Sequence, residues 1–245
     1  MKTLQHIQKN FNIKSKNINN YKINAFGSKE SFLNYIADKK KILVAMNAEK
    51  ILKDDIKLRE IVRNNIGYCD GVGAVMALKR CGLDSVKIAG CEFWLDIINR
   101  FNSIKRFYLI GSTNKVIEST VKRLKQEYPK IDIVGYRDGY LGDGDRESLL
   151  KDLKYKKPDI VFVAQGSPRQ ELLMSELMDK YPALYMGLGG SFDIYGGDKK
   201  RAPAIFLKYQ LEWFYRLLIE PTRLKRQFSI IKFLFLHTLF GLNGR

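Results

Sequence analysis

Apolar residues in the middle of the chain gather in short runs, and the stretches between these runs repeat apolar residues at helical spacing. Short apolar runs bounded by glycine or polar residues are typical of buried strands. This pattern predicts six strands, at residues 41–46, 86–89, 106–110, 131–136, 160–164 and 183–186. It predicts helices at residues 53–64, 74–80, 112–128, 146–154 and 168–180. The alternation predicts an α/β fold with a Rossmann-like, mostly parallel sheet flanked by helices and built from right-handed βαβ units.

Several of the predicted strands end in glycine or in Gly-Ser. Ligands of parallel sheets bind outside the carboxyl ends of the strands, where backbone N–H groups at helix starts suit a diphosphate. One glycine after a strand is usually only a turn. Three such pairs in one sheet are better evidence: Gly111-Ser112, Gly166-Ser167 and Gly189-Gly190. The chain has no G-x-G-x-x-G fingerprint followed by a ribose-binding acid and no G-K-[ST] loop, so a nicotinamide enzyme or a P-loop NTPase is not expected.

Asp70 is the candidate general base. It stands in the glycine-rich turn 67–73, directly after Tyr68 and Cys69. Apolar neighbours raise the pKa of an aspartate toward working pH, where it can accept a proton. The residues alone slightly favour a different role, because Asp is common as the N-cap of a helix.

Two carboxamides also follow predicted strands. Asn47 and Gln170 can orient sugar hydroxyls or an acetamido group, although each alone is more typical of a turn or a helix cap. Glu49 and Lys50 fit a solvated pair on the surface. A shared binding site for these residues is supported only if the fold brings them together.

Four further aspartates stand outside the predicted strands and helices, at 138, 143, 145 and 193. Asp138 fits either a site residue or a loop brace, and Asp193 fits either a sugar contact or a partner of Lys200 or Arg201. The segment 143–145 reads D-G-D, the form in which many sugar transferases bind a metal and a nucleotide. It lies in a glycine-rich loop before a helix, where both aspartates serve as caps, so no metal site is expected there.

Positive charge is concentrated at the two ends of the chain. The formal net charge is +17, and residues 1–41 hold nine Lys/Arg against two acids, while residues 199–245 hold ten against two. We expect a basic lead-in at 1–22, an α/β core at 23–198 and a basic, aromatic helical appendage at 199–245. Charge placed in this way fits a membrane surface or a phosphate-bearing ligand. The longest apolar run of the appendage, 233–236, is far shorter than a membrane span of about 20 residues.

Cysteine and histidine do not indicate a metal centre. The three cysteines have no C-x-x-C spacing and fit reduced thiols of a cytosolic core. Neither of the two histidines has a partner at ligand spacing, so zinc is not expected. The first residues lack the long apolar stretch of a secretory signal.

Six segments in order resemble the signature of the WecG/TagA/CpsF glycosyltransferases, glycosyltransferase family 26. They are VAMNAEK, CDGVG, GYRDGY, AQGSPRQE, GGSFDIYGGDKKRAP and LEWFYRLLIEPTRLKRQ, and the resemblance covers roughly residues 42–235. It implies a GT-E type fold, no cofactor and no metal. It also implies that Asp70 is the general base for the acceptor hydroxyl, which reverses the preference for an N-cap.

The resemblance implies an inverting, metal-independent hexosyltransferase of bacterial cell-surface polysaccharide synthesis, as in enterobacterial common antigen or teichoic acid. It would move an N-acetylhexosamine-type sugar from UDP to a polyprenyl-diphosphate-linked sugar such as an undecaprenyl one. N-acetylmannosaminuronic acid or N-acetylmannosamine is favoured, and another UDP-hexose is the alternative. The UDP donor would contact Asn47, Gly71, Gly111, Ser112, Asp138, Gly166, Ser167, Gln170, Glu171, Gly189, Gly190 and Asp193. The diphosphate and acceptor would contact Lys200, Arg201, Arg216, Arg223 and Arg226.

The same resemblance implies a peripheral enzyme on the cytoplasmic face of the inner membrane. Its C-terminal helices would dock on anionic lipid and complete the active site, with homo-oligomerisation possible. Two other classes of protein fit the charge: a basic α/β protein that binds nucleic acid, and a membrane-associated scaffold without activity. The first would lose binding uniformly with salt, and the second would tolerate Asp70→Asn.

Overall fold

The computed structural model describes residues 13–142, 144–197 and 203. They form an eight-stranded sheet in the order β1-β2-β4-β3-β8-β7-β5-β6, in which only the β1–β2 pair is antiparallel. The strands are β1 (Ser15–Ile18), β2 (Tyr21–Asn24), β3 (Ile42–Met46), β4 (Ile66–Cys69), β5 (Arg106–Gly111), β6 (Asp132–Arg137), β7 (Ile160–Ala164) and β8 (Leu184–Gly187). The predicted α/β fold class, with a mostly parallel sheet, is confirmed.

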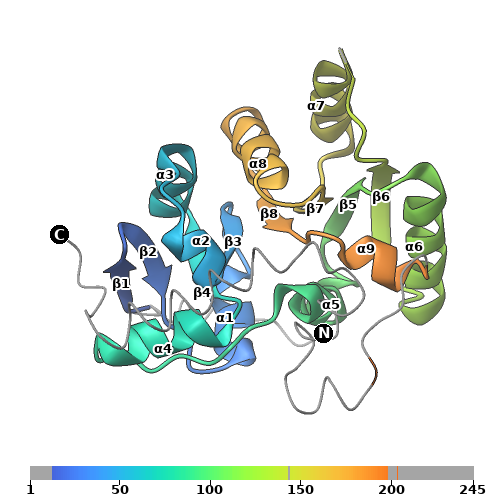
Figure 1. Ribbon diagram of the computed structural model, residues 1–245. Coiled ribbons are helices and arrows are strands. Elements are labelled where there is room, and N and C mark those ends of the chain that lie inside the picture. Colours follow the sequence, from blue (N-terminus) through green and yellow to red (C-terminus); the bar gives the residue numbers. More distant parts are fainter. Residues whose placement is uncertain (1–12, 143, 198–202, 204–245) are drawn as a thin grey trace.

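Helices cover both faces of the sheet. They are α1 (Lys29–Ile36), α2 (Ala48–Leu52), α3 (Ile56–Asn64), α4 (Val72–Arg80), α5 (Gly90–Phe101), α6 (Asn114–Glu127), α7 (Asp145–Lys156), α8 (Arg169–Lys180) and α9 (Ser191–Tyr195). Figure 1 shows α3, α8 and α7 in a row along one face, with α1, α5 and α6 on the other. Connections that step along the sheet in opposite directions use opposite faces, as right-handed crossovers require.

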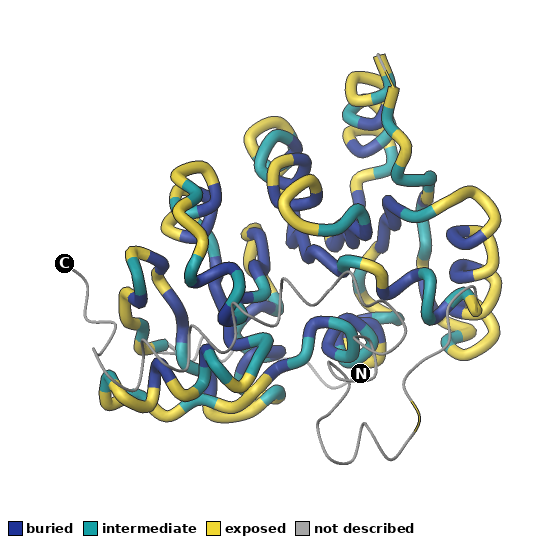
Figure 2. The backbone as a smooth tube through the Cα atoms, in the orientation of Figure 1, coloured by how far each residue is buried: buried dark blue, intermediate teal, exposed yellow. Residues whose placement is uncertain are grey.

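Each face of the sheet has its own apolar core. The first contains Phe32, Phe93, Trp94 and Phe162 with the inner sides of α1, α5 and α6. The second contains Tyr185 and Met174 with the inner sides of α3, α7 and α8. Figure 2 shows the buried positions on the strands and on the helix sides that face them. Because the central strands are covered on both faces, they read as continuous apolar runs, and this made β3, β5, β7 and β8 predictable from the sequence.

The strand predicted at 86–89 is wrong. This segment is extended but has no strand ladder, with two separate backbone bonds, from Val86 N–H to Phe26 O (2.9 Å) and from Ile88 N–H to Cys69 O (2.8 Å). Only Ile88 in the run is fully buried. The segment links α4 to α5 past the ends of β2 and β4, so no neighbouring strand remains with which it can pair.

Other elements were absent from the sequence prediction. The β1–β2 hairpin begins at Ser15, within the segment expected as a lead-in, because Ile18 and Tyr21 join the second core. Residues 66–69 form β4 where only a glycine turn was expected. Helices α1, α2, α5 and α9 were also missed. Five of these elements, β1, β2, β4, α2 and α9, have five residues or fewer, which leaves little room for a helical or strand period.

Candidate active site at the carboxyl edge

Asp70 and Asn47 lie together where β4 and β3 end. The two strands are parallel neighbours, and Asp70 N–H donates to Met46 O at 3.0 Å. A methyl group on Gly71 would lie 3.5 Å from Asn47 Cβ. The chain leaves β3 toward the α3 face and leaves β4 toward the α5 face, and ligands of open α/β sheets bind next to such a reversal. The residue predicted as base and the carboxamide predicted to orient a sugar are neighbours at these two strand ends.

The Asp70 carboxylate binds the start of α5. Its Oδ1 accepts a hydrogen bond from Gly90 N–H at 2.7 Å, and Gly90 is the first residue of that helix. The N-cap of α4 is instead Gly71, which has no side-chain bond, so Asp70 is not the cap of the helix that follows it. The carboxylate thus meets a backbone donor at the positive end of a 12-residue helix.

Tyr68 adds a second oxygen beside Asp70. Residues two apart on a strand face the same side, and an added methyl on Gly90 would lie 2.7 Å from Tyr68 Oη and 3.3 Å from Asp70 Oδ1. The hydroxyl is buried and has no hydrogen-bond partner among the described residues. Burial, followed by the nearby Asp70 charge, raises the pKa of Tyr68 well above its usual value. Sequence reasoning missed this residue, because a buried tyrosine has no distinctive local signal.

Asn47 caps α2, its side-chain Oδ1 accepting from Lys50 N–H at 3.0 Å, which matches the cap role considered for it. Glu49 and Lys50 do not form the solvated pair that was one interpretation of them. Lys50 Nζ turns inward to Glu171 Oε1 at 2.7 Å, with side-chain exposures of 8% and 2%, and Glu49 pairs with Lys53 at 3.2 Å. Because Lys50 and Glu171 are 121 residues apart, no local pattern reveals their contact.

Gln170 and Glu171 begin α8 and are both buried. Gln170 Oε1 accepts from Gly189 N–H at 2.8 Å, while its Nε2 donates to Glu171 Oε1 at 3.2 Å. Burial by itself raises the pKa of Glu171, but the Lys50 charge and the hydrogen bonds from Lys50 and Gln170 outweigh burial, so the pKa lies below its usual value. Glu171 is therefore held as a carboxylate.

Two of the backbone donors expected to hold a diphosphate already donate within the protein. Ser112 N–H bonds Ala164 O at 3.2 Å, and Gly189 N–H bonds Gln170. Ser112 has a φ of 58°, and its hydroxyl donates to Asp193 Oδ1. The Ser112 contact ties the end of β5 to α9, so these two turns are braced against one another. Gly166, exposed Ser167 and Gly190 lie at the same edge.

Asp138 braces its own loop, since its Oδ1 accepts from Tyr140 N–H at 2.8 Å. Asp145, the second aspartate of the D-G-D segment, binds Arg137 at 2.9 Å and Gly142 N–H at 2.6 Å. The Arg137 hydrogen bond, then the one from Gly142, lowers the pKa of Asp145. Asp143 lies outside the described residues. Among residues 13–142 and 144–197, no three His, Cys, Asp or Glu side chains come close enough to hold a metal ion.

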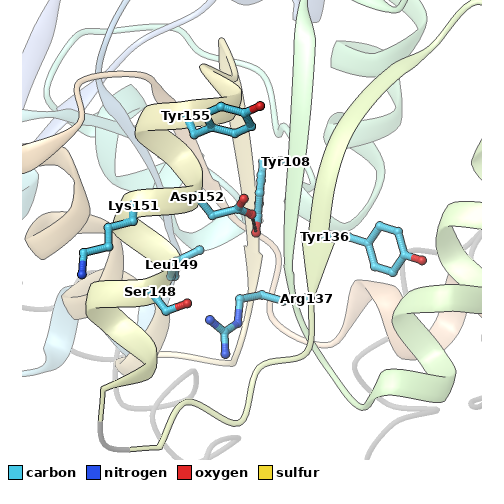
Figure 3. A pocket seen from close by; sticks show the side chains of 8 residues that line it. All are labelled: Tyr108, Tyr136, Arg137, Ser148, Leu149, Lys151, Asp152 and Tyr155. Atoms are coloured by element: carbon cyan, nitrogen blue, oxygen red, sulfur yellow. Dashed lines mark hydrogen bonds between the residues drawn. The ribbon is translucent and has the colours of Figure 1, made fainter.

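A groove of about 510 Å³ lies between the edge strand β6 and α7. Figure 3 shows Arg137 and Asp152 directed toward the space beside α7, whereas Tyr136 projects away from that helix. Its charged residues are already paired: Arg137 with Asp145, Lys151 with Glu147 and Asp152 with Lys156. Because β6 is five strands from β4, this groove is separate from the strand end that carries Asp70.

The predicted diphosphate and acceptor contacts Lys200, Arg201, Arg216, Arg223 and Arg226 lie outside the described residues, as does the C-terminal appendage. None of the helices in the described part is both long and apolar enough to span a membrane.

Comparison with protein-family models gives a match to the description "Glycosyl transferase WecG/TagA/CpsF family" over residues 16–243. The match spans the sheet, the Asp70 turn and nearly all of the remaining chain.

Proposed function

This chain belongs to the WecG/TagA/CpsF glycosyltransferase family, and we propose that it is an inverting, metal-independent hexosyltransferase that uses a UDP-sugar. The sugar is of the N-acetylhexosamine type, with N-acetylmannosaminuronic acid or N-acetylmannosamine favoured. The acceptor is a sugar linked to polyprenyl diphosphate in bacterial cell-surface polysaccharide synthesis. The family supports transfer of a sugar, and the finer choices are proposals.

The observation that carries the proposal is the Asp70 carboxylate at the ends of β3 and β4. Gly90 N–H holds this carboxylate, so the backbone of α5 sets its position. In the proposed step, Asp70 takes the proton of the acceptor hydroxyl, and that oxygen attacks the anomeric carbon opposite UDP. The bond from the anomeric carbon to the UDP oxygen breaks, and its electron pair leaves on the diphosphate. Attack from the opposite side inverts the anomeric centre.

Asn47 is close enough to Asp70 to orient the sugar during this step, and Gln170 provides a second carboxamide at the same edge. Ser112 N–H and Gly189 N–H already donate within the protein, so the diphosphate needs other partners. Arg201, Arg216, Arg223 and Arg226 provide them in this proposal, since guanidinium groups match phosphate oxygens in pairs. The appendage would also hold the enzyme on the anionic cytoplasmic face of the inner membrane.

The test measures UDP release from UDP-N-acetylmannosamine and from its uronic acid, with a short prenyl-diphosphate-N-acetylglucosamine acceptor and EDTA. Asp70→Asn keeps the shape but not the proton acceptor, so we expect turnover to fall about 10²- to 10⁴-fold with the melting temperature little changed. Glu147→Gln, exposed on α7, is the matched control and should keep full turnover.

Turnover by Asp70→Asn at the wild-type rate would rule out Asp70 as the general base. Loss of wild-type turnover in EDTA would rule out metal independence. If neither donor is used, a panel of other UDP-hexoses decides whether the donor or the reaction class is wrong.

A further inference from the structure

Lys50 and Glu171 form the most deeply buried ion pair among the described residues. Their side-chain exposures are 8% and 2%, whereas in every other described pair at least one side chain is more than 30% exposed. Neither residue is close to the other in sequence, so the pair joins two separate parts of the fold. It lies at the carboxyl edge, between α2 and α8.

The pair is the centre of a chain of hydrogen bonds across the middle of the sheet. Lys50 Nζ also donates to Ala45 O of β3 at 3.0 Å. Glu171 Oε1 also accepts from Gln170, whose own oxygen holds Gly189 N–H in the turn after β8. The network therefore joins β3, α2, α8 and the β8–α9 turn. Those segments carry Asn47, Gln170, Glu171, Gly189 and Gly190, five of the residues expected to contact the donor.

Stability alone is a poor explanation of this pair. Burial of two charges costs about as much as their attraction returns, and apolar residues of similar volume are often as stable or more so. Glu171 Oε2 has no hydrogen-bond partner among the described residues, which adds a further cost. An ion pair differs from an apolar pair in that its charged atoms fix the direction of neighbouring hydrogen bonds, here those to Ala45 O and from Gln170 Nε2.

We propose that Lys50 and Glu171 are positioning residues that fix the Gln170 carboxamide and, through it, the Gly189–Gly190 turn. The expected effect on turnover rests on the proposed function, whereas the expected effect on the geometry of the Gly189–Gly190 turn does not. Neither residue needs to touch the substrate, so Glu171, expected from the family resemblance to contact the donor, acts through Gln170 instead.

The double variant Lys50→Met/Glu171→Leu separates an effect on the geometry of the Gly189–Gly190 turn from an effect on stability. Each single change leaves one buried charge without its partner and should lower the melting temperature, and the double change should recover most of that loss. Amide hydrogen exchange by NMR then reports on the turn. We expect Gly189 N–H to exchange roughly tenfold faster or more in the double variant, while Leu188 N–H, bonded to Val163 O at 2.8 Å, stays as in wild type. In the transferase assay, kcat/KM should fall about 10- to 100-fold, despite the recovered stability.

The matched control is Glu147→Leu/Lys151→Met, which removes an exposed pair on α7. It should change neither Gly189 exchange nor turnover. A double variant at Lys50 and Glu171 with recovered melting temperature, wild-type Gly189 exchange and wild-type turnover would overturn the proposal.

If that double variant does not fold, Lys50→Arg replaces it. The planar guanidinium keeps the charge but cannot reproduce both contacts of the ammonium. Faster Gly189 exchange is again expected, and unchanged exchange would overturn the proposal. The exchange readout needs no activity, so a wild type without turnover would refute the proposed function and leave the positioning claim to be decided by exchange.

Discussion

The ends of β4 and β5 are both glycine turns at the same edge of the sheet, but they are used differently. At β5, the Ser112 N–H and hydroxyl both have partners inside the protein. At β4, the buried Tyr68 hydroxyl has no partner in the described part of the chain and lies beside the Asp70 carboxylate. The β5 turn is thus built as a brace, and the β4 turn retains unused hydrogen-bonding capacity. A glycine after a strand therefore indicates a binding site only where nearby polar groups still lack hydrogen-bond partners.

The largest effect expected in this comparison is structural, at the β5 brace. Gly111 has a φ of +143°, and an added methyl would lie 2.4 Å from Ala164 O, a backbone atom that cannot move aside easily. Gly111→Ala should lower the free energy of unfolding in urea by about 3 kcal/mol or more. Gly27→Ala is the control, because nothing lies within 4 Å of its added methyl and it should change stability by less than about 0.5 kcal/mol. Equal stabilities would show that the β5 end is not a brace.

A smaller effect is expected at the β4 end. Gly90→Ala places a methyl 2.7 Å from Tyr68 Oη and 3.3 Å from Asp70 Oδ1, so we expect a loss of about 1–3 kcal/mol and reduced turnover. Tyr68→Phe removes the crowding oxygen without breaking a described hydrogen bond, so alone it should not lower stability. Added to Gly90→Ala, it should restore part of the lost free energy in a double-mutant cycle. Strict additivity would mean that the two side chains do not meet.

The smallest expected effect is on the pH dependence of the free energy of unfolding, through the Lys50–Glu171 pair between α2 and α8. The folded-state pKa of Glu171 lies below its ordinary value of 4.5, because the Lys50 charge and hydrogen bonds outweigh burial. Its stabilising contribution is therefore complete above that ordinary value and is lost as pH falls through the lowered pKa. Unfolding free energy measured from roughly pH 6 to 3 should fall more steeply in wild type than in Lys50→Met/Glu171→Leu. Parallel curves would contradict a paired carboxylate at Glu171.

The sequence predicted the fold class well because the central strands are buried on both faces. Their apolar runs are continuous, and a helix of regular length follows most of them. It failed at residues 86–89, where a local alternation like that of a strand has no neighbour for a ladder. It missed α5, whose first residue holds Asp70, although Phe93, Trp94, Ile97 and Ile98 form a clear helical stripe.

In the candidate site, too, some residues could be predicted from the sequence and others could not. Asn47 and Gln170 were chosen from the sequence because each follows a predicted strand, and parallel strands bring their carboxyl ends to one edge. Asp70 was chosen because it stands in a glycine-rich turn that matches a segment of the family signature. Tyr68 and Lys50 were not chosen, since a buried tyrosine and a lysine on a short helix have no distinctive local signal. The roles of the arginines at 201, 216, 223 and 226 remain proposals, because they lie outside the described residues.

The sequence by itself determined the βαβ alternation, the two-faced burial of the sheet and the edge at which the polar residues gather, because these follow from local apolar periods and strand ends. Tertiary structure alone decided that Asp70 is held by α5, that Lys50 is paired with Glu171, and that the Gly189 N–H is taken by Gln170. Each of these contacts joins segments 19 to 121 residues apart. The order of strands in the sheet sets such contacts, and no local pattern of residues specifies that order.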